Sequence, residues 1–426
     1  MYTIGNIISR FKGGSLIKHS FWALFGNVIR QGLSLLSGII IARFLGKDLY
    51  GEFGTIKITL TYIAIVSTFG FGYTATKYVA EYVRDKSGKI ISLIRVMLRI
   101  TLIFSTLLAL LLFVFANQIA VFIDATHLAG NLKMSSIIII VNAINSTQIG
   151  ILSGFKEFKR IAKTNSYAGI VTFITSVFFT YWGGLDGAVC SLLVSFLFQV
   201  ILNGISIRKV TKEFKNQKEV DQIEIMKILS FSTPIALQES LYTVLHWANL
   251  LVLIKYANYG EVGISSAASL WQSVVIFIPG VLKNVMFSHL ITTVDHKRLV
   301  KKLLLIHFIT TIIPFIFILL FSRMIVSFYG DSFSQLKPVL IIQICSAVFI
   351  SLSEVYCYEF ISIGKPWFVF FARLIRDLGA IIIGYLFVVN FIECQAFWMS
   401  IAALIMNIMF LLVLFILYKT NVINTK

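Results

Sequence analysis

The stretch from residue 20 to residue 43, SFWALFGNVIRQGLSLLSGIIIAR, is long and apolar enough to cross a membrane as one helix. An α-helical span needs about 20 mostly apolar residues, and this stretch carries only Arg30 in its middle and Arg43 at its end. Eleven similar runs follow, so the sequence predicts an all-α polytopic membrane protein with about twelve transmembrane helices. The predicted spans are residues 20–43, 54–76, 92–117, 134–154, 165–183, 187–207, 230–254, 264–284, 303–326, 338–362, 367–389 and 396–418.

The composition excludes a soluble protein. Of 426 residues, 58% are hydrophobic and 13% are charged, whereas about a quarter of the residues of a soluble domain are charged. In a soluble chain, the formal net charge of +18 would suggest binding to nucleic acid, but here the Lys and Arg residues are distributed as the membrane topology requires. With the N-terminus in the cytoplasm, 24 of the 37 Lys and Arg residues fall in cytoplasmic segments and 6 in outer segments. By the positive-inside rule, we expect both termini in the cytoplasm and no nucleic-acid partner.

The sequence carries none of the common catalytic motifs. The phosphate loop GxxxxGK[ST], the zinc motif HExxH and the nucleophile motif GxSxG do not occur, and the four cysteines lack metal-ligand spacing. We therefore expect no catalytic residue, no metal and no cofactor, and interpret the protein as a secondary transporter rather than an enzyme. A proton or a sodium ion is the candidate coupling ion.

A short motif occurs twice, 209 residues apart. YGEFG at residues 50–54 follows the first predicted span, and YGEVG at residues 259–263 follows the seventh. Both copies lie on the same side of the membrane, after the first helix of a six-helix half, which indicates a parallel internal repeat. We predict two pseudo-symmetric six-helix bundles, residues 1–207 and 230–426, joined by a charged cytoplasmic linker at residues 208–229. The substrate path is expected between the bundles.

Two corresponding spans carry polar stripes in register. Residues three and four positions apart share one face of a helix. The stripe of the first span is Asn27, Arg30, Ser34 and Ser37, and that of the seventh is Glu239, Thr243, His246 and Asn249. A lipid-facing helix does not tolerate such a stripe, so we expect the two to face each other across a water-filled cavity or a seam. The alternative is that these side chains only join helices by hydrogen bonds.

The charges inside the predicted spans differ in sign between the two halves. Those of the first half are all positive: Arg30, Lys57, Arg95 and Arg99. The four in-span acids all belong to the second half: Glu239, Glu354, Glu359 and Asp377. Arg30 lies about 15 Å from the inner end of its helix, close to mid-bilayer, whereas the other three cations are near enough to span ends to reach the interface.

This asymmetry defines two sets of candidate residues. A positive first half suits an anionic head group, because Arg and Lys are the natural partners of phosphate. The candidate substrate-binding residues are Arg30, Asn27, Ser34, Lys57 and Arg99. The candidate coupling or gating residues are Glu239, His246, Asn249, Glu354 and Asp377. Arg373 and Asp377 lie four residues apart, so a self-neutralising pair is the alternative for this acid.

Several segments, in order along the chain, resemble one known family. They are ARFLG at 42–46 with YGEF at 50–53, GYTATKYVAE at 72–81, residues 154–165, GGLDGA at 183–188 and GEVGI at 260–264. With the length and the twelve spans, they are similar to the polysaccharide-biosynthesis flippases. These are the O-antigen and capsule repeat-unit translocases (Wzx-type) of the multidrug/oligosaccharidyl-lipid/polysaccharide exporter superfamily.

The resemblance implies a two-lobed, alternating-access transporter. Its substrate would be an undecaprenyl-pyrophosphate-linked oligosaccharide, moved from the cytoplasmic to the periplasmic leaflet of a bacterial inner membrane. A basic central cavity, with Arg30 at a cavity-lining position, would hold the pyrophosphate and sugars while the tail stays in membrane lipid. A polysaccharide polymerase and a chain-length regulator are the candidate protein partners. Many relatives carry Asp near the end of the seventh helix, where this chain has Asn249, and often Tyr where it has Ser265. If that Asp serves ion coupling in the relatives, the resemblance implies that coupling here is lost or moved to Glu239.

Two alternatives stay open. A cation-coupled multidrug exporter of the same superfamily would favour acids over arginines in the first half, opposite to what the sequence has. A membrane polymerase or glycosyltransferase would present acidic residues on a sizeable water-facing loop, whereas the predicted outer loops are short.

Overall fold

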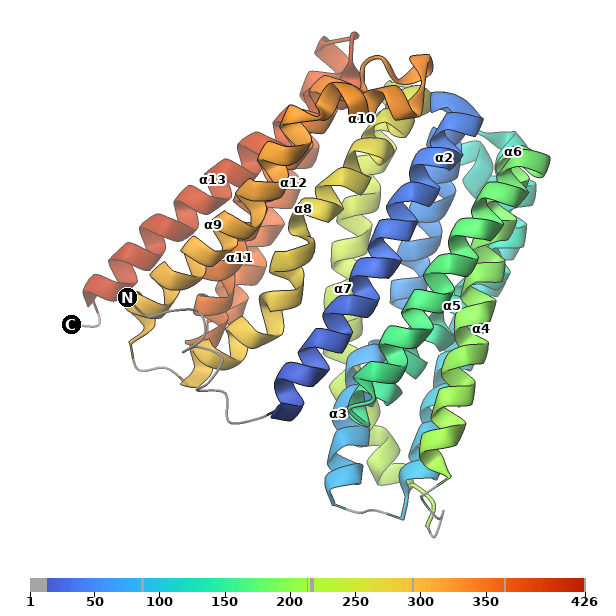
Figure 1. Cartoon of the computed structure of the whole chain (residues 1–426), viewed down its shortest axis with the longest axis vertical. Coiled ribbons are helices and arrows are strands. Elements are labelled where there is room, and N and C mark those ends of the chain that lie inside the picture. Colours follow the sequence, from blue (N-terminus) through green and yellow to red (C-terminus); the bar gives the residue numbers. More distant parts are fainter. Residues whose placement is uncertain are drawn as a thin grey trace. The chain divides into compact units, whose positions relative to one another are not determined.

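The computed structural model in Figure 1 describes residues 14–85, 88–212, 214, 218–292, 295–363 and 365–424. Over these residues the chain consists of helices and their connections, with no strand, which confirms the predicted all-α fold. The two ends of the chain that we expect in the cytoplasm, residues 1–13 and 425–426, lie outside the described residues.

The helices follow one another along the chain with short connections. They are α2 (Gly14–Ser67), α3 (Phe71–Arg84), α4 (Ile90–Phe122), α5 (Ala129–Gly154), α6 (Phe158–Thr211), α7 (Gln222–Tyr256), α8 (Tyr259–Thr292), α9 (His296–Leu320), α10 (Ser322–Tyr329), α11 (Leu336–Ser362), α12 (Pro366–Asn390) and α13 (Gln395–Asn424). Short 3-10 turns, η1 (Thr126–Leu128) and η2 (Asp331–Phe333), precede α5 and α11.

Two of the longest helices are broken at a glycine. The backbone leaves helical geometry at Gly46 in α2 (φ 71°, ψ 175°) and at Gly184 in α6 (φ 52°, ψ −129°), conformations that glycine adopts without steric cost. Among the described residues, eight stretches are long and apolar enough to cross a membrane, and two of them contain these breaks. Dividing both stretches and adding α7 and α12 gives twelve helices, in agreement with the predicted number.

Each half of the chain is built around one central helix. α5 packs against α3, α4 and α6, and α11 packs against α8, α9, α12 and α13. These two helices are also the most enclosed of the candidate spans, with 61% of their apolar window buried. α11 begins 207 residues after α5, close to the 209-residue offset of the sequence motif.

The repeat extends to unusual backbone conformations. Asp124 (φ 56°) lies two residues before the first 3-10 turn, and Gly330 (φ 90°) directly before the second. Gly184 (φ 52°) and Cys394 (φ 53°) precede the last helix of each half, 210 residues apart. A left-handed conformation is costly for residues other than glycine, so its recurrence supports two pseudo-symmetric halves.

Contacts divide the chain into two compact units. The first unit consists of residues 1–37 and 56–244, and the second of residues 38–55 and 245–426. Both α2 and α7 therefore contribute residues to each unit. The segment 38–55, which carries the first copy of the repeated motif, belongs to the second unit. α6 ends at Thr211 and α7 begins at Gln222, so helices occupy both ends of the predicted linker, while its boundaries and those of the two bundles stay predictions.

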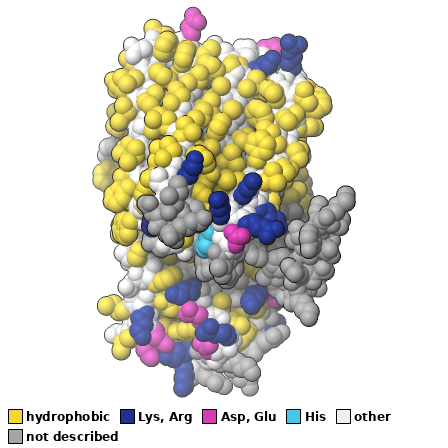
Figure 2. Space-filling model, turned by 90° about the vertical axis from the view of Figure 1, so that its left-hand side faces the viewer, with side chains coloured by type: hydrophobic (Ala, Val, Ile, Leu, Met, Phe, Trp, Pro, Cys, Tyr) yellow, Lys and Arg dark blue, Asp and Glu magenta, His cyan; other side chains and the backbone are white. Residues whose placement is uncertain are grey.

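Large apolar side chains cover the outside of these helices, the reverse of a soluble protein. α9, for example, exposes Leu305, Ile309, Ile313 and Leu320. Figure 2 shows a face on which apolar side chains cover a broad, nearly continuous area. Helices satisfy all their backbone groups internally, which is what a lipid environment requires. The chain is a multi-pass membrane protein.

Candidate substrate site

Two predicted cations of the first unit come together in the structure. Arg30, before the glycine break of α2, and Lys57, after it, are both half-buried and lie close enough for their charges to repel each other. Among the described residues, neither side chain forms an ion pair with a carboxylate. A charge close to mid-bilayer, as expected for Arg30, costs at least about 2.5–3.5 kcal/mol, and the neighbouring charge of Lys57 adds repulsion, so an anion would stabilise the pair.

The packing of α2 against α6 fixes the position of Arg30. A Cβ on Gly26 would lie 2.4 Å from the Cα of Ala162, and a Cβ on Gly169 would lie 3.2 Å from the Cα of Arg30. Without side chains at these two positions, the helices approach closely, as is common in membranes. The crossing holds the backbone of Arg30 against a rigid neighbour.

The other residues of the first polar stripe have mixed roles. Asn165 of α6 donates from Nδ2 to the Oδ1 of Asn27 at 3.2 Å, so Asn27 joins two helices. Ser37 is buried and donates to the carbonyl of Leu33 at 2.8 Å. Ser34 is half-buried on the helix turn after Arg30. The structure thus gives Asn27 a contact between helices, while a role of Arg30 and Ser34 in ligand binding stays a prediction.

Arg99 differs from this pair in its exposure. It is exposed on α4, on the same face as the exposed apolar side chains of Leu102 and Ile103. An Arg on an apolar outer face extends its charged end toward the membrane interface. Its exposure makes Arg99 a weaker candidate than Arg30 and Lys57, and its place in the substrate site stays a prediction.

Glu239, the predicted counterpart of Arg30, is half-buried on the part of α7 that belongs to the first unit. Its carboxylate interacts electrostatically with the phenol of Tyr73 in α3. Arg30 forms no ion pair with it. His246 and Asn249 belong to the second unit, so the predicted facing of the two stripes stays a prediction.

The charges of the second unit pair with one another. Arg373 of α12 donates to Glu354 of α11 at 2.7 Å, and Arg376 contacts its neighbour Asp377 at 2.7 Å. The alternative that Arg373 and Asp377 neutralise each other is wrong, because α11 presents Glu354 to Arg373 and Asp377 pairs with Arg376 instead. The first unit thus carries unneutralised positive charge, whereas these charges of the second unit cancel.

The remaining coupling candidates lie near this second network. His246 of α7 interacts electrostatically with Asp377 and, less strongly, with Arg376. Asn249, one turn further along α7, has a buried Oδ1 that finds no hydrogen-bond partner within the described part of the chain. Among the described residues, no group of three His, Cys, Asp or Glu side chains is placed to hold a metal ion.

A comparison with protein families identifies the chain. Residues 16–288 match the family model described as "Polysaccharide biosynthesis protein", which is well over half of the sequence. The chain belongs to the polysaccharide biosynthesis protein family. No curated protein matches it significantly.

Solved structures similar to this polysaccharide biosynthesis protein are transporters. An inward-facing multidrug resistance MATE family transporter of the MOP superfamily has a TM-score of 0.76 at 16% identity, over 94% of this chain and 98% of that chain. The lipid II flippase MurJ, in an inward closed conformation, has a TM-score of 0.73 at 17% identity, over 92% of this chain and 86% of that chain. A mutant of the Vibrio cholerae MATE transporter VcmN has a TM-score of 0.70 at 13% identity, over 96% of this chain and 97% of that chain. At these identities the likeness shows a shared fold.

The repeated motif of this polysaccharide biosynthesis protein has a structural role that the sequence reading missed. Its two copies lie against each other within the second unit. A Cβ on Gly51 would lie 1.8 Å from the carbonyl oxygen of Tyr259, and a Cβ on Gly263 would lie 2.0 Å from that of Lys47. The glycines shared by both copies were the available signal, because such close backbone contact requires a residue without a side chain.

The sequence also did not predict a cluster of polar contacts at the start of α7. The Lys89 ammonium donates to Asp221 at 3.0 Å and to Glu224 at 2.9 Å, and the Tyr82 hydroxyl donates to Glu224 at 3.2 Å. Partial burial raises the pKa of Glu224, but the hydrogen bonds from Lys89 and from the Asp221 N–H outweigh it and hold the pKa below its ordinary value. The same two carboxylates raise the pKa of Lys89. The cluster ties α7 to the beginning of α4.

Proposed function

We propose that this protein is a flippase for an undecaprenyl-pyrophosphate-linked oligosaccharide, the repeat unit of O-antigen or of another surface polysaccharide. It moves this lipid from the cytoplasmic to the periplasmic leaflet of the bacterial inner membrane, with both of its termini in the cytoplasm. Membership of the family and the transporter fold support a flippase. A polysaccharide polymerase and a chain-length regulator are the proposed partners downstream.

The observation that carries the substrate class is the pair of Arg30 and Lys57. Arg binds phosphate oxygens through two parallel N–H donors, and Lys adds a compact point charge. A hydrogen bond to a charged group contributes about 1.5–3 kcal/mol, so two such contacts supply about 3–6 kcal/mol. This is comparable to the cost of holding Arg30 close to mid-bilayer, at least about 2.5–3.5 kcal/mol, together with the repulsion between the two cations. An anionic ligand therefore stabilises an arrangement that is unfavourable without one.

We propose Glu239 as the residue that couples transport to a proton or a sodium ion. Glu354 and Asp377 are weaker candidates, because each is already held by an arginine. His246, next to Asp377, is proposed to help set the balance between the access states. Replacing Glu239 by Gln should abolish the response of transport to an imposed proton or sodium gradient, and an unchanged response would assign coupling elsewhere.

The experiment that tests the proposed substrate is lipid flipping in proteoliposomes. A fluorescent undecaprenyl-pyrophosphate oligosaccharide in the inner leaflet becomes accessible to a membrane-impermeant quencher only after it is flipped. The Arg30→Gln/Lys57→Gln variant should lose at least about 100-fold in rate, since it loses two charged contacts. The Arg30→Lys/Lys57→Arg variant keeps both charges and should retain more activity.

A matched control separates this site from net charge. The Arg95→Gln/Arg99→Gln variant removes the same charge from exposed positions of α4 and should flip at nearly the wild-type rate. Equal rates for the two double-Gln variants would refute the proposed site. Transport of cationic drugs, without flipping of the lipid-linked sugar, would favour the multidrug exporter instead. Elongation of the sugar by the purified protein would favour a polymerase or glycosyltransferase.

A further inference from the structure

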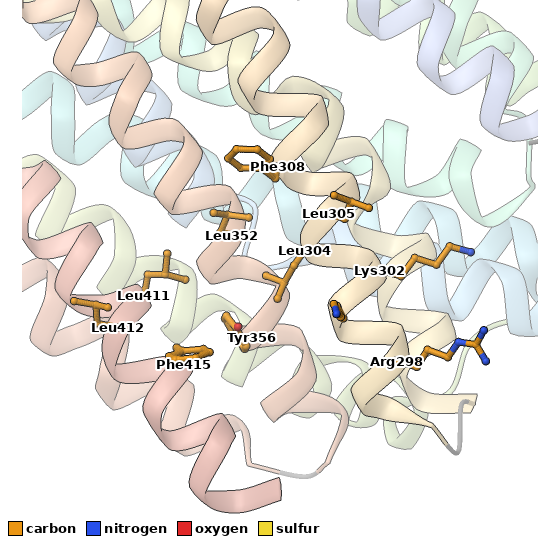
Figure 3. A pocket seen from close by; sticks show the side chains of 11 residues that line it. Arg298, Lys302, Leu304, Leu305, Phe308, Leu352, Tyr356, Leu411, Leu412 and Phe415 are labelled. Carbon is orange, nitrogen blue, oxygen red and sulfur yellow. The ribbon is translucent and has the colours of Figure 1, made fainter.

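A groove opens on the second unit between α9, α11 and α13 (Figure 3). Its volume is about 710 Å³, within the range of pockets that hold one small ligand. All three helices are candidate membrane spans, so the groove lies beside lipid rather than in a soluble domain. No residue proposed for the flippase site lines it.

One edge of the groove is strongly basic. Arg298, Lys301 and Lys302 stand on the first two turns of α9 and are all exposed. Figure 3 shows Arg298 and Lys302 extending from the α9 side, away from α13. No ion pair involves any of the three among the described residues.

Two acids at the start of α9 are already engaged. Asp295 caps α9 by accepting a hydrogen bond from the backbone N–H of Arg298 at 3.1 Å. Glu359 of α11 contacts the Nδ1 of His296 at 3.1 Å. The positive charge of the groove edge is therefore available to an external anion.

The rest of the groove is apolar. Leu305 and Phe308 of α9 form one wall, Leu352 of α11 lies in the floor, and Leu412 and Phe415 of α13 form the opposite wall (Figure 3). From Lys301 to Phe308 the helix rises about 10 Å, so the apolar part continues from the basic edge toward the membrane interior.

We propose that this groove binds an anionic glycerophospholipid of the surrounding bilayer. Its phosphate lies against Arg298, Lys301 and Lys302, and one acyl chain lies along Leu305, Phe308 and Phe415. Basic residues next to an apolar surface between membrane helices are the arrangement that recognises anionic lipid head groups. This site is independent of the proposed flippase function.

The test uses full-length protein carrying Phe415→Trp as a reporter in the groove. The protein is reconstituted in phosphatidylcholine vesicles with increasing amounts of dibrominated phosphatidylglycerol or, in parallel, dibrominated phosphatidylcholine. Bromine quenches only a nearby Trp, and the signal of protein without the added Trp is subtracted. Phosphatidylglycerol should reach half-maximal quenching at a mole fraction at least about tenfold lower than phosphatidylcholine, since each nearby cation contributes roughly a fivefold preference.

Charge variants connect the preference to the basic edge. In the Phe415→Trp background, Arg298→Gln/Lys301→Gln/Lys302→Gln should shift the phosphatidylglycerol curve onto the phosphatidylcholine curve. The control Arg208→Gln/Lys212→Gln/Lys218→Gln removes the same charge from exposed positions outside the groove and should leave the curve in place. In the protein that carries only Phe415→Trp, high salt should weaken the preference for phosphatidylglycerol. This measurement tests the same interaction if the triple variant does not fold.

Three outcomes would overturn the proposal. They are identical curves for the two brominated lipids, a preference that survives both the triple variant and high salt, and recovery of the fluorescence by an equimolar amount of undecaprenyl phosphate. The last result would assign the groove to a polyprenyl tail.

Discussion

The glycine contact between the two copies of the repeated motif offers a test with a calculable size. Gly51→Ala adds one methyl group to α2. That carbon would lie 1.8 Å from the carbonyl oxygen of Tyr259 and 2.9 Å from the backbone nitrogen of Gly263, whereas ordinary contact begins at 3.4 Å. The two backbones must separate by about 1.6 Å, because no side chain can rotate away to make room.

The expected free-energy change follows from two opposing terms. Overpacking costs about 1–3 kcal/mol, and a clash with backbone falls at the upper end of that range. Alanine is favoured over glycine inside a helix by about 1 kcal/mol. We therefore expect Gly51→Ala to destabilise the protein by about 2 kcal/mol.

Thermal unfolding of the purified protein in detergent measures this change. Gly32→Ala is the matched control, because it lies in the same helix and its added carbon meets nothing within 4 Å. Gly51→Ala should lower the unfolding midpoint by several degrees, whereas Gly32→Ala should leave it unchanged or raise it. A Gly51→Ala midpoint at or above that of the unsubstituted protein would refute the backbone contact.

Three further changes have expected outcomes in the same unfolding assay. Glu354→Gln should destabilise the protein by about 2 kcal/mol, because it leaves the partly buried Arg373 without its anionic partner, and an unchanged midpoint would show that the ion pair contributes little. Cys394→Gly should stabilise it by about 1 kcal/mol by relieving a left-handed backbone, φ 53°, and a lower midpoint would contradict that strain. The pKa of Glu224 is held below its ordinary value, so its contact with Lys89 stabilises the folded protein above pH 4.5. This stabilisation is lost as the pH falls through the lowered pKa and the carboxylate becomes protonated. Glu224→Gln should lower the midpoint at neutral pH and reduce its fall in acid, and equal acid sensitivity of the two proteins would exclude this carboxylate.

The helical fold could be predicted from the sequence because lipid leaves few options. A backbone without water must bond internally, so each long apolar run becomes a helix. The connections were harder to predict. The polar segment between the first two predicted spans is helical on both sides of Gly46, and only the glycine interrupts it. The hydropathy pattern shows that this segment is polar, but it does not show that the helix continues through it.

The sign of the charge at the candidate site could be predicted from the sequence, but not which charged side chains form ion pairs. The positive charge of Arg30 and Lys57 was evident from residue types alone. Which cations lack a partner depends on the neighbouring helices, as Arg373 shows by pairing with Glu354 of α11 rather than with Asp377 of its own helix. Spacing along one helix reports which side chains share a face and says nothing of the helix packed against it.

The most direct test of the central claim is the affinity of the purified protein for undecaprenyl pyrophosphate compared with uncharged undecaprenol, measured by native mass spectrometry. If Arg30 and Lys57 bind the pyrophosphate, the unsubstituted protein should prefer the charged lipid by about 100-fold or more, and Arg30→Gln/Lys57→Gln should lose most of that preference. An equal preference in both proteins would contradict the assignment of these two residues as the pyrophosphate site.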